Sequence, residues 1–186
     1  MELKMMKRFI CILTAVALVF ALSACGKTPE TPEVVTSVSQ AEAGGITQMP
    51  DFESVDLEGN AVDSTIFEQA DITVVNFWGT FCPPCIDEMP ALAEWDEELP
   101  ENVQIIGIVV DVPSETVPEL ETAKELVAQS GIKYTNIIAS DQFGGVFQHL
   151  IGVPTTFFVD SEGKVLCDEV IGADVDAYKR MMEDLQ

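Results

Sequence analysis

Positive charge is scarce in this sequence of 186 residues, which has 9 Lys and Arg against 32 Asp and Glu, and a single His. The formal net charge is -23 at pH 7. A surface of this sign gains nothing from neutralising phosphates and is repelled by an anionic bilayer surface, which excludes nucleic acid as a partner. High solubility is the simplest role of this charge, and steering toward basic partners is the alternative.

Long hydrophobic runs are also missing, because no apolar stretch reaches the about 20 residues that a membrane-spanning helix needs. The apolar run at residues 9–22 has 14 residues and follows a basic segment that contains Lys4, Lys7 and Arg8. This pattern is typical of an export signal, and we predict that residues 1–24 are a signal peptide. An uncut anchor and a plain secretory signal are the alternatives.

The segment Leu22-Ser23-Ala24-Cys25 resembles the lipobox of bacterial lipoprotein precursors. The resemblance implies cleavage before Cys25 and lipid attachment to Cys25, and two acyl chains there would give stable anchoring. Residues 25–47 are rich in Thr, Pro, Glu, Ser and Gly without a sustained period, so we predict a lipid-anchored disordered linker. Residues 48–186 then form one domain.

Apolar runs and helical patterns alternate along residues 48–186. A hairpin is predicted near residues 52–61, strands at 72–77, 103–111, 136–139, 155–160 and 164–170, and helices at 86–99, 115–130, 141–150 and 174–185. This order predicts an α/β fold with a central mixed β-sheet flanked by helices and an N-terminal β-hairpin extension.

The motif Cys82-Pro83-Pro84-Cys85 follows a predicted strand and opens a predicted helix, a context in which C-x-x-C indicates a redox-active pair. A thiol at a helix N-terminus faces free N–H groups and the positive end of the helix dipole, which favour its thiolate. Cys82 is therefore the predicted exposed nucleophile. Cys85 lies one turn later, where its sulfur can resolve a mixed disulfide on Cys82. The two prolines remove two N–H donors and should moderate the effect on the thiol pKa.

Residues 76–90, with the sequence NFWGTFCPPCIDEMP, and Gly152-Val153-Pro154-Thr155-Thr156 together resemble the TlpA/ResA-like branch of the thioredoxin fold. The resemblance covers roughly residues 49–186 and implies a thioredoxin-like domain. It also implies a membrane-tethered, extracytoplasmic thiol–disulfide oxidoreductase that reduces client proteins, takes electrons from a membrane thiol–disulfide carrier and needs no cofactor. Pro154 would be cis and would present the Val153 backbone to an extended client strand. The candidate client-binding residues are Trp78, Phe81, Pro83, Val153 and Thr155.

Glu88 matches the acidic residue that this branch carries six positions after the first Cys. It lies one turn beyond Cys85, where it could exchange protons with that thiol, and burial would raise its pKa. A solvated carboxylate beside Asp87 is the alternative. Asn76 occupies the strand position where ordinary thioredoxins carry a buried Asp, so the proton role would pass to Glu88 or to water.

Other classes fit the residues less well. A peroxiredoxin needs Thr or Ser where this chain has Gly79, and a catalytic Arg, whereas the one Arg after the predicted signal is Arg180. A zinc site could use Cys82, Cys85, Cys167 and His149, but a second paired ligand motif is missing. Copper-delivery proteins of this fold carry C-x-x-x-C with a His. A non-enzymatic thioredoxin-fold surface lipoprotein, for binding or metal delivery, would be expected to lose one Cys.

Cys167 lies on the predicted strand at residues 164–170 and is expected to be a small half-buried residue. A third redox thiol or an intermolecular cross-link are the alternatives. Taken together, the sequence predicts a protein-disulfide reductase anchored by lipid at the extracytoplasmic face of a bacterial cell membrane. An oxidant would share this architecture and differ in reduction potential, so the sequence leaves the direction of electron flow open. Cytochrome c apoproteins, a methionine sulfoxide reductase and other envelope proteins are all compatible clients.

Overall fold

A five-stranded sheet forms the centre of the computed structural model, which describes residues 45–113 and 117–186. The strand order is β5-β4-β3-β6-β7. The strands are β3 (Ile72–Trp78), β4 (Val103–Val109), β5 (Asn136–Ile138), β6 (Thr155–Asp160) and β7 (Val170–Ile171). The first three are parallel to one another, β6 is antiparallel to β3, and β7 is antiparallel to β6. The predicted mixed sheet is confirmed.

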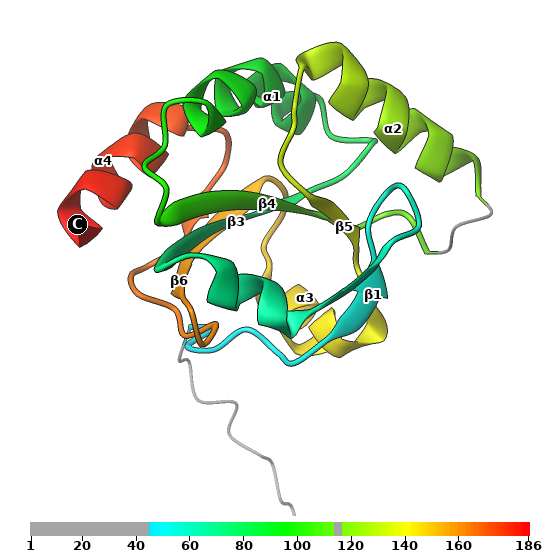
Figure 1. Cartoon of the computed structure of the whole chain (residues 1–186). Helices are drawn as coiled ribbons and strands as arrows, with labels where there is room; N and C mark the ends of the chain where they lie inside the picture. Colours follow the sequence, from blue (N-terminus) through cyan, green and yellow to red (C-terminus); the bar gives the residue numbers. More distant parts are fainter. Residues whose placement is uncertain (1–44, 114–116) are drawn as a thin grey trace, which may run out of the picture. The chain divides into compact units, whose positions relative to one another are not determined.

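Helices cover both faces of this sheet (Figure 1). On one face lie α1 (Pro83–Asp96), α2 (Pro118–Ser130) and α4 (Val175–Leu185), and on the other lie α3 (Gly144–His149) and the 3-10 helices η1 (Ser64–Gln69) and η2 (Asp141–Phe143). The predicted hairpin is confirmed as β1 (Glu53–Val55) paired with β2 (Ala61–Asp63). It is fixed to the edge of the sheet where Ser54 Oγ donates to the Ile138 carbonyl at 2.5 Å.

β3 runs through the middle of the sheet and is buried along its whole length. Its side chains alternate between the faces, so Ile72 and Val74 pack toward α1 and α4, whereas Phe77 packs toward α3. The same alternation places Asn76 on the α1 face. There its side chain meets Glu88 of α1, which brings the end of β3 and the start of α1 into one polar cluster.

Two helices begin at prolines, and this explains where the predicted boundaries were wrong. α1 begins at Pro83 rather than at residue 86, and α2 at Pro118 rather than at residue 115. Proline suits the first helical turn because its φ is already helical and its missing N–H has no partner there. α2 ends as predicted at Gly131, whose φ of 77° is the left-handed value that glycine adopts readily.

The predicted continuous strand at residues 164–170 was wrong. Val165 makes an isolated bridge to Val159, and only Val170–Ile171 form a strand. Between them the chain bends at Cys167, whose side chain packs against the cluster under α1 and α4. Cys167 is therefore half-buried as expected, but it does not lie on a strand.

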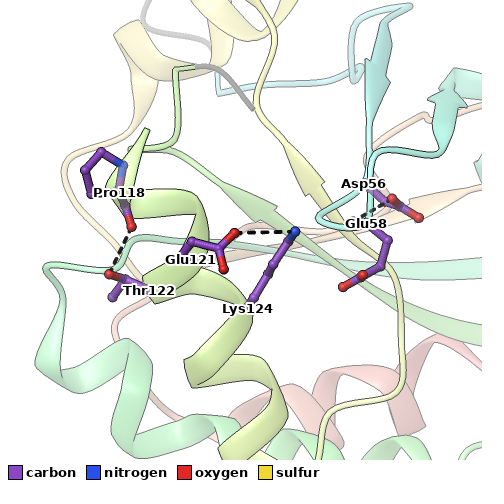
Figure 2. A network of polar contacts seen from close by, with 6 residues as sticks. All are labelled: Asp56, Glu58, Pro118, Glu121, Thr122 and Lys124. Atoms are coloured by element: carbon purple, nitrogen blue, oxygen red, sulfur yellow. Dashed lines mark hydrogen bonds and ion pairs between the residues drawn. The ribbon is translucent and has the colours of Figure 1, made fainter. Parts of the chain in front are cut away.

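The turn of the β1–β2 hairpin faces α2 across a polar hollow of about 340 Å³. Figure 2 shows the two sides, with Asp56 and Glu58 on the turn and Lys124 on the helix. The Asp56 carboxylate accepts the Glu58 N–H at 2.9 Å, and Lys124 pairs with Glu121 at 3.7 Å. The hollow is thus lined by side chains of both positive and negative charge.

Three sequence predictions concern parts of the chain outside the described residues. They are the signal peptide at residues 1–24, the lipidated Cys25, and the linker at residues 25–47 except for its last three residues. Within residues 45–113 and 117–186, none of the helices combines the length and the apolar character that crossing a bilayer requires.

Candidate active site

Cys82 and Cys85 are joined by a disulfide at the N-terminus of α1, directly after β3. Cys82 caps the helix, and the Cys85 N–H donates to Cys82 Sγ at 3.2 Å. Pro83 and Pro84 carry no N–H, so this is the first backbone donor of the helix that the sulfur can use. In the dithiol form, this one N–H and the helix dipole would stabilise a Cys82 thiolate.

Cys82 is less accessible than the sequence predicted. It is 4% exposed in the disulfide form, so the prediction of an exposed nucleophile was wrong for this state. Its sulfur lies 3.4 Å from the Val153 carbonyl oxygen, and the 66% exposed Phe81 stands beside it. Cys82 is one of the residues that line a groove on the surface.

This groove has a volume of about 560 Å³ and an apolar lining. Phe81, Pro83 and Val153, which the sequence singled out as client-binding residues, all lie in its wall. The groove is completed by Cys82, Pro84, Val110, Phe147, Leu150 and Gly152. Sequence reasoning missed Phe147 and Leu150, although their spacing of three on a helix shortly before the Pro154 motif was an available signal.

The Val153–Pro154 peptide bond is cis, as the family resemblance implied. Two other candidate client-binding residues, Trp78 and Thr155, do not line the groove. Trp78 is 1% exposed and donates its indole N–H to Asn136 Oδ1 at 2.9 Å. Thr155 is equally buried, and its hydroxyl donates to the Gly152 carbonyl at 2.8 Å, so both residues belong to the interior of the fold.

Asp111 is a site residue that the sequence analysis did not identify. Its carboxylate accepts the Thr80 N–H at 3.0 Å and the Thr80 hydroxyl at 2.5 Å. Asp111 follows β4 and Thr80 follows β3, and the carboxyl ends of neighbouring parallel strands lie at the same edge of a sheet. Asp111 therefore fixes the loop that enters the Cys82 motif.

Glu88 is buried, with 5% of its surface exposed, so the alternative of a solvated carboxylate is excluded. Its Oε1 accepts from Asn76 Nδ2 at 3.0 Å, and its Oε2 lies 3.0 Å from the Tyr178 hydroxyl. Asn76 Nδ2 also donates to the Thr156 hydroxyl at 3.0 Å. Burial raises the pKa of Glu88 to about 7, against the lowering effect of its hydrogen bonds to Asn76 and Tyr178.

The comparisons with known proteins agree with this geometry. The model of the family described as "AhpC/TSA family" matches residues 46–167. The chain belongs to the AhpC/TSA family.

Similar proteins include several named thiol-disulfide oxidoreductase ResA. The chain is 33% identical over 122 residues to the ResA of Bacillus thuringiensis subsp. konkukian, a match that covers 64% of this chain and 65% of the relative. It is 33% identical over 132 residues to the ResA of Bacillus anthracis, covering 67% and 68% of the two chains. The chain thus spans about 65% of the length of the first relative. The resemblance to the TlpA/ResA-like branch is confirmed.

The fold is confirmed by a solved structure, the thioredoxin domain of a thiol-disulfide oxidoreductase from Bacteroides vulgatus. The two share 22% sequence identity with a TM-score of 0.61, and the match covers 77% of this chain and all of the other. The described residues therefore have a thioredoxin-like fold with the N-terminal hairpin that the sequence predicted.

Membership of the AhpC/TSA family does not by itself point to peroxidase chemistry. Gly79 stands three residues before Cys82, at the position where a peroxidase needs a hydroxyl. A Cβ built on Gly79 would lie 2.6 Å from the ring of Phe81, so a Thr or Ser there would displace a wall of the groove. The reactive groups of this site are instead the two cysteines, Cys82 and Cys85, which form its disulfide.

Cys167 and His149, the other two residues of the zinc alternative, do not line the groove at Cys82. Cys167 is a free thiol, and burial, together with the nearby Asp168 charge, raises its pKa, which makes it a poor nucleophile. His149 Nε2 lies 2.8 Å from Glu169 Oε1, so the imidazole pairs with a carboxylate.

Proposed function

We propose that the chain is a thiol–disulfide oxidoreductase that reduces disulfides of client proteins through the Cys82/Cys85 dithiol. The observation that carries the proposal is the pair itself. One cysteine receives a helix N-terminal N–H and lines an apolar groove, and its partner one turn later is joined to it by a disulfide. The names of the relatives support the same chemistry.

The first step of the proposed reaction is the attack of the Cys82 thiolate on a client disulfide. A bond forms between Cys82 Sγ and one client sulfur, the client S–S bond breaks, and the other client sulfur leaves as a thiolate. The groove and the Val153 backbone hold the client segment during this step. Val153 is suited to this role because its carbonyl oxygen lies beside Cys82 Sγ.

In the second step Cys85 resolves the mixed disulfide. The Cys85 thiol gives its proton to the Glu88 carboxylate, and the thiolate attacks Cys82 Sγ, which forms the disulfide of this structure and releases the second client thiolate. Two electrons have then passed from the pair to the client. Asn76 and Tyr178 hold Glu88 for this role, since their side chains meet its two oxygens. The test of the proposed function is the reduction potential of the pair, measured together with the fate of a protein disulfide.

The site of action is proposed to be the extracytoplasmic face of a bacterial cell membrane. The basic segment, the apolar run and the lipobox-like residues 22–25 support export and lipid attachment at Cys25. A membrane thiol–disulfide carrier would return electrons to the pair. The acidic surface is compatible with this location because the tether, and not the protein surface, makes the contact with lipid.

Replacing the proposed lipid attachment residue tests the anchor. Cys25→Ser is expected to leave the precursor uncleaved and without lipid, so that the protein in membranes loses its acyl mass. The matched control is Cys11→Ser, which alters a cysteine inside the apolar run and should leave processing unchanged. Mass spectrometry of the mature N-terminus reads both results, and a mature wild-type chain that begins unmodified at any residue other than Cys25 contradicts the anchor.

A further inference from the structure

Tyr178 on α4 places its hydroxyl beside two oxygen atoms that can accept its proton, and the same hydroxyl is hydrogen-bonded to the Thr156 side chain. The hydroxyl lies 3.0 Å from Glu88 Oε2 and 2.8 Å from the carbonyl oxygen of Gly172, and the tyrosine is fully buried. A hydroxyl has one proton to donate, so it cannot donate to both oxygens at once. Which one receives the proton depends on whether Glu88 is protonated.

When Glu88 is protonated, all three groups are satisfied. The Glu88 carboxyl donates to the Tyr178 oxygen, and Tyr178 donates to the Gly172 carbonyl. When Glu88 is ionised, a charge-assisted bond makes the carboxylate the stronger acceptor, so Tyr178 turns its proton to Glu88 and Gly172 loses its partner. The proton on Glu88 thus selects the direction of the Tyr178 hydroxyl.

Gly172 is in turn bonded to the proline segment of the groove. Its N–H donates to the Pro154 carbonyl at 2.8 Å, next to the pairing of Thr155 with Ile171 in β6 and β7. The φ of Gly172 is 93°, a value that glycine adopts without strain. A hydrogen bond gained or lost at the Gly172 carbonyl therefore acts one residue away from the segment that shapes the client groove.

We propose that Tyr178 is a positioning residue that passes the protonation state of Glu88 to the Gly172 turn, and through it to Pro154. The inference rests on the proposed function, in which Glu88 is ionised before Cys85 reacts and protonated after it. In the dithiol form Tyr178 faces Glu88 and the Gly172 turn is released for client docking. In the disulfide form, as long as Glu88 keeps the proton it took from Cys85, Tyr178 holds the Gly172 carbonyl and the groove has the arrangement of this structure.

The surroundings of Glu88 leave it as the group that titrates near neutral pH in the disulfide form. Asn76 of β3 donates to Glu88 and carries no charge, and neither does Thr156 of β6, which is bonded to Asn76. Burial raises the pKa of Tyr134, and also that of Tyr178, so both remain neutral across the range that matters. Cys85, on the same helix, does not titrate while it is in the disulfide.

Carbon-13 NMR of the disulfide form between pH 5 and pH 9 tests this coupling. In the wild-type chain the Gly172 carbonyl shift is expected to titrate with the same midpoint as the Glu88 carboxyl carbon. In Tyr178→Phe the Glu88 carbon should still titrate while the Gly172 carbonyl stays flat, and in Glu88→Gln the Gly172 carbonyl should also be flat. The Gly131 carbonyl, at the end of α2, is the reference that should not respond in any variant.

The inference is overturned if, in the wild-type chain, the chemical shift of the Gly172 carbonyl carbon does not change with pH while Glu88 titrates. It is also overturned if the Gly172 carbonyl shift still titrates in Tyr178→Phe. If Tyr178→Phe does not fold, the comparison of wild type with Glu88→Gln decides alone. The titration needs no client, so a chain that shows it without reducing disulfides contradicts the proposed function and not this coupling. A chain that reduces disulfides but whose Gly172 carbonyl shift does not change with pH contradicts only the coupling.

Kinetic measurements provide a second test of the coupling between Tyr178 and Glu88. Tyr178→Phe is expected to slow the resolution of a mixed disulfide on Cys82 by about tenfold in the wild-type background and by less than about twofold in the Glu88→Gln background, because residues that act through one another are not additive. Equal effects in both backgrounds would mean that Tyr178 acts independently of Glu88. That outcome overturns its assignment as a positioning residue.

Discussion

Cys85→Ser is expected to accumulate covalent complexes with client proteins through Cys82, with disulfide turnover falling below detection. The reason is that Cys82 can still attack a client disulfide, while the sulfur that resolves the mixed disulfide is gone. Cys82→Ser should also abolish turnover but should trap few clients, because Cys85 is 1% exposed and does not line the groove. Non-reducing electrophoresis followed by mass spectrometry of the trapped species measures both results.

Cys167→Ser is the matched control for the two cysteine variants. Its thiol lies at the bend between Val165 and β7, and we expect neither trapping nor loss of turnover when it is replaced. Equal trapping by the Cys82 and Cys85 variants would contradict the assigned order of attack. A Cys167 variant without turnover would show that a third thiol takes part.

Glu88→Gln is expected to slow the resolution of a mixed disulfide on Cys82 by about 100-fold, the low end of the usual contribution of a general acid or base, because water can substitute in part. Glutamine keeps nearly the same shape but cannot take the proton of Cys85. The wild-type rate should rise with pH through an inflection near the Glu88 pKa of about 7, and the variant should lack this inflection. Single-turnover kinetics between pH 5 and pH 9 measure the difference.

The same variant should change how stability depends on pH. The pKa of Glu88 is raised in the fold to about 7 from an ordinary value of 4.5, so the native state binds the proton more tightly than the unfolded state. The free energy of unfolding of the wild-type disulfide form should therefore fall by up to about 3 kcal/mol as pH rises from about 4.5 to 7, and then level off. Glu88→Gln should remove this fall, so that it matches the wild type near pH 5 and exceeds it near pH 8.

Asp87→Asn is the control for both measurements, because Asp87 is the exposed neighbour on the same helix. It should leave the rate profile and the stability curve of the wild type unchanged, since exposed substitutions usually shift stability by under about 0.5 kcal/mol. Identical rate profiles for Glu88→Gln and the wild type would contradict the proton role. Proton transfer would then run through solvent.

Local features of the site could be predicted from the sequence because neighbouring residues determine them. The β-branched run of β3, the helix that opens at the C-x-x-C motif, and the hairpin turn at Gly59 are all encoded within a few residues. Burial of Glu88 was one of two alternatives that the sequence left open, and the structure decides between them. The long segment at residues 164–170 could not be predicted correctly, because its pairing with β6 is interrupted where Cys167 turns toward the cluster under α1 and α4.

Contacts between distant segments could not be predicted in this way. The Thr80–Asp111 bonds join the ends of two parallel strands. The Tyr178–Glu88 contact joins α4 to α1 through two residues that are 90 positions apart in the sequence. The order of the strands and the docking of α4 must be known before either contact can be inferred. Burial of Trp78 has the same cause, since its partner Asn136 comes from the distant β5.

The reduction potential of the Cys82/Cys85 pair tests the central claim most directly. A single helix N–H supports the Cys82 sulfur, so the dithiol form is not strongly stabilised, and strong stabilisation of that form is what makes a pair an oxidant. We therefore expect equilibration with glutathione or thioredoxin buffers to give a potential below about -200 mV, on the side of thioredoxin at about -270 mV. The reduced chain should transfer two electrons to a protein disulfide and end with Cys82 joined to Cys85. A potential near about -120 mV, the value of a strong oxidant, or a pair that does not cycle between dithiol and disulfide, would contradict a reductase.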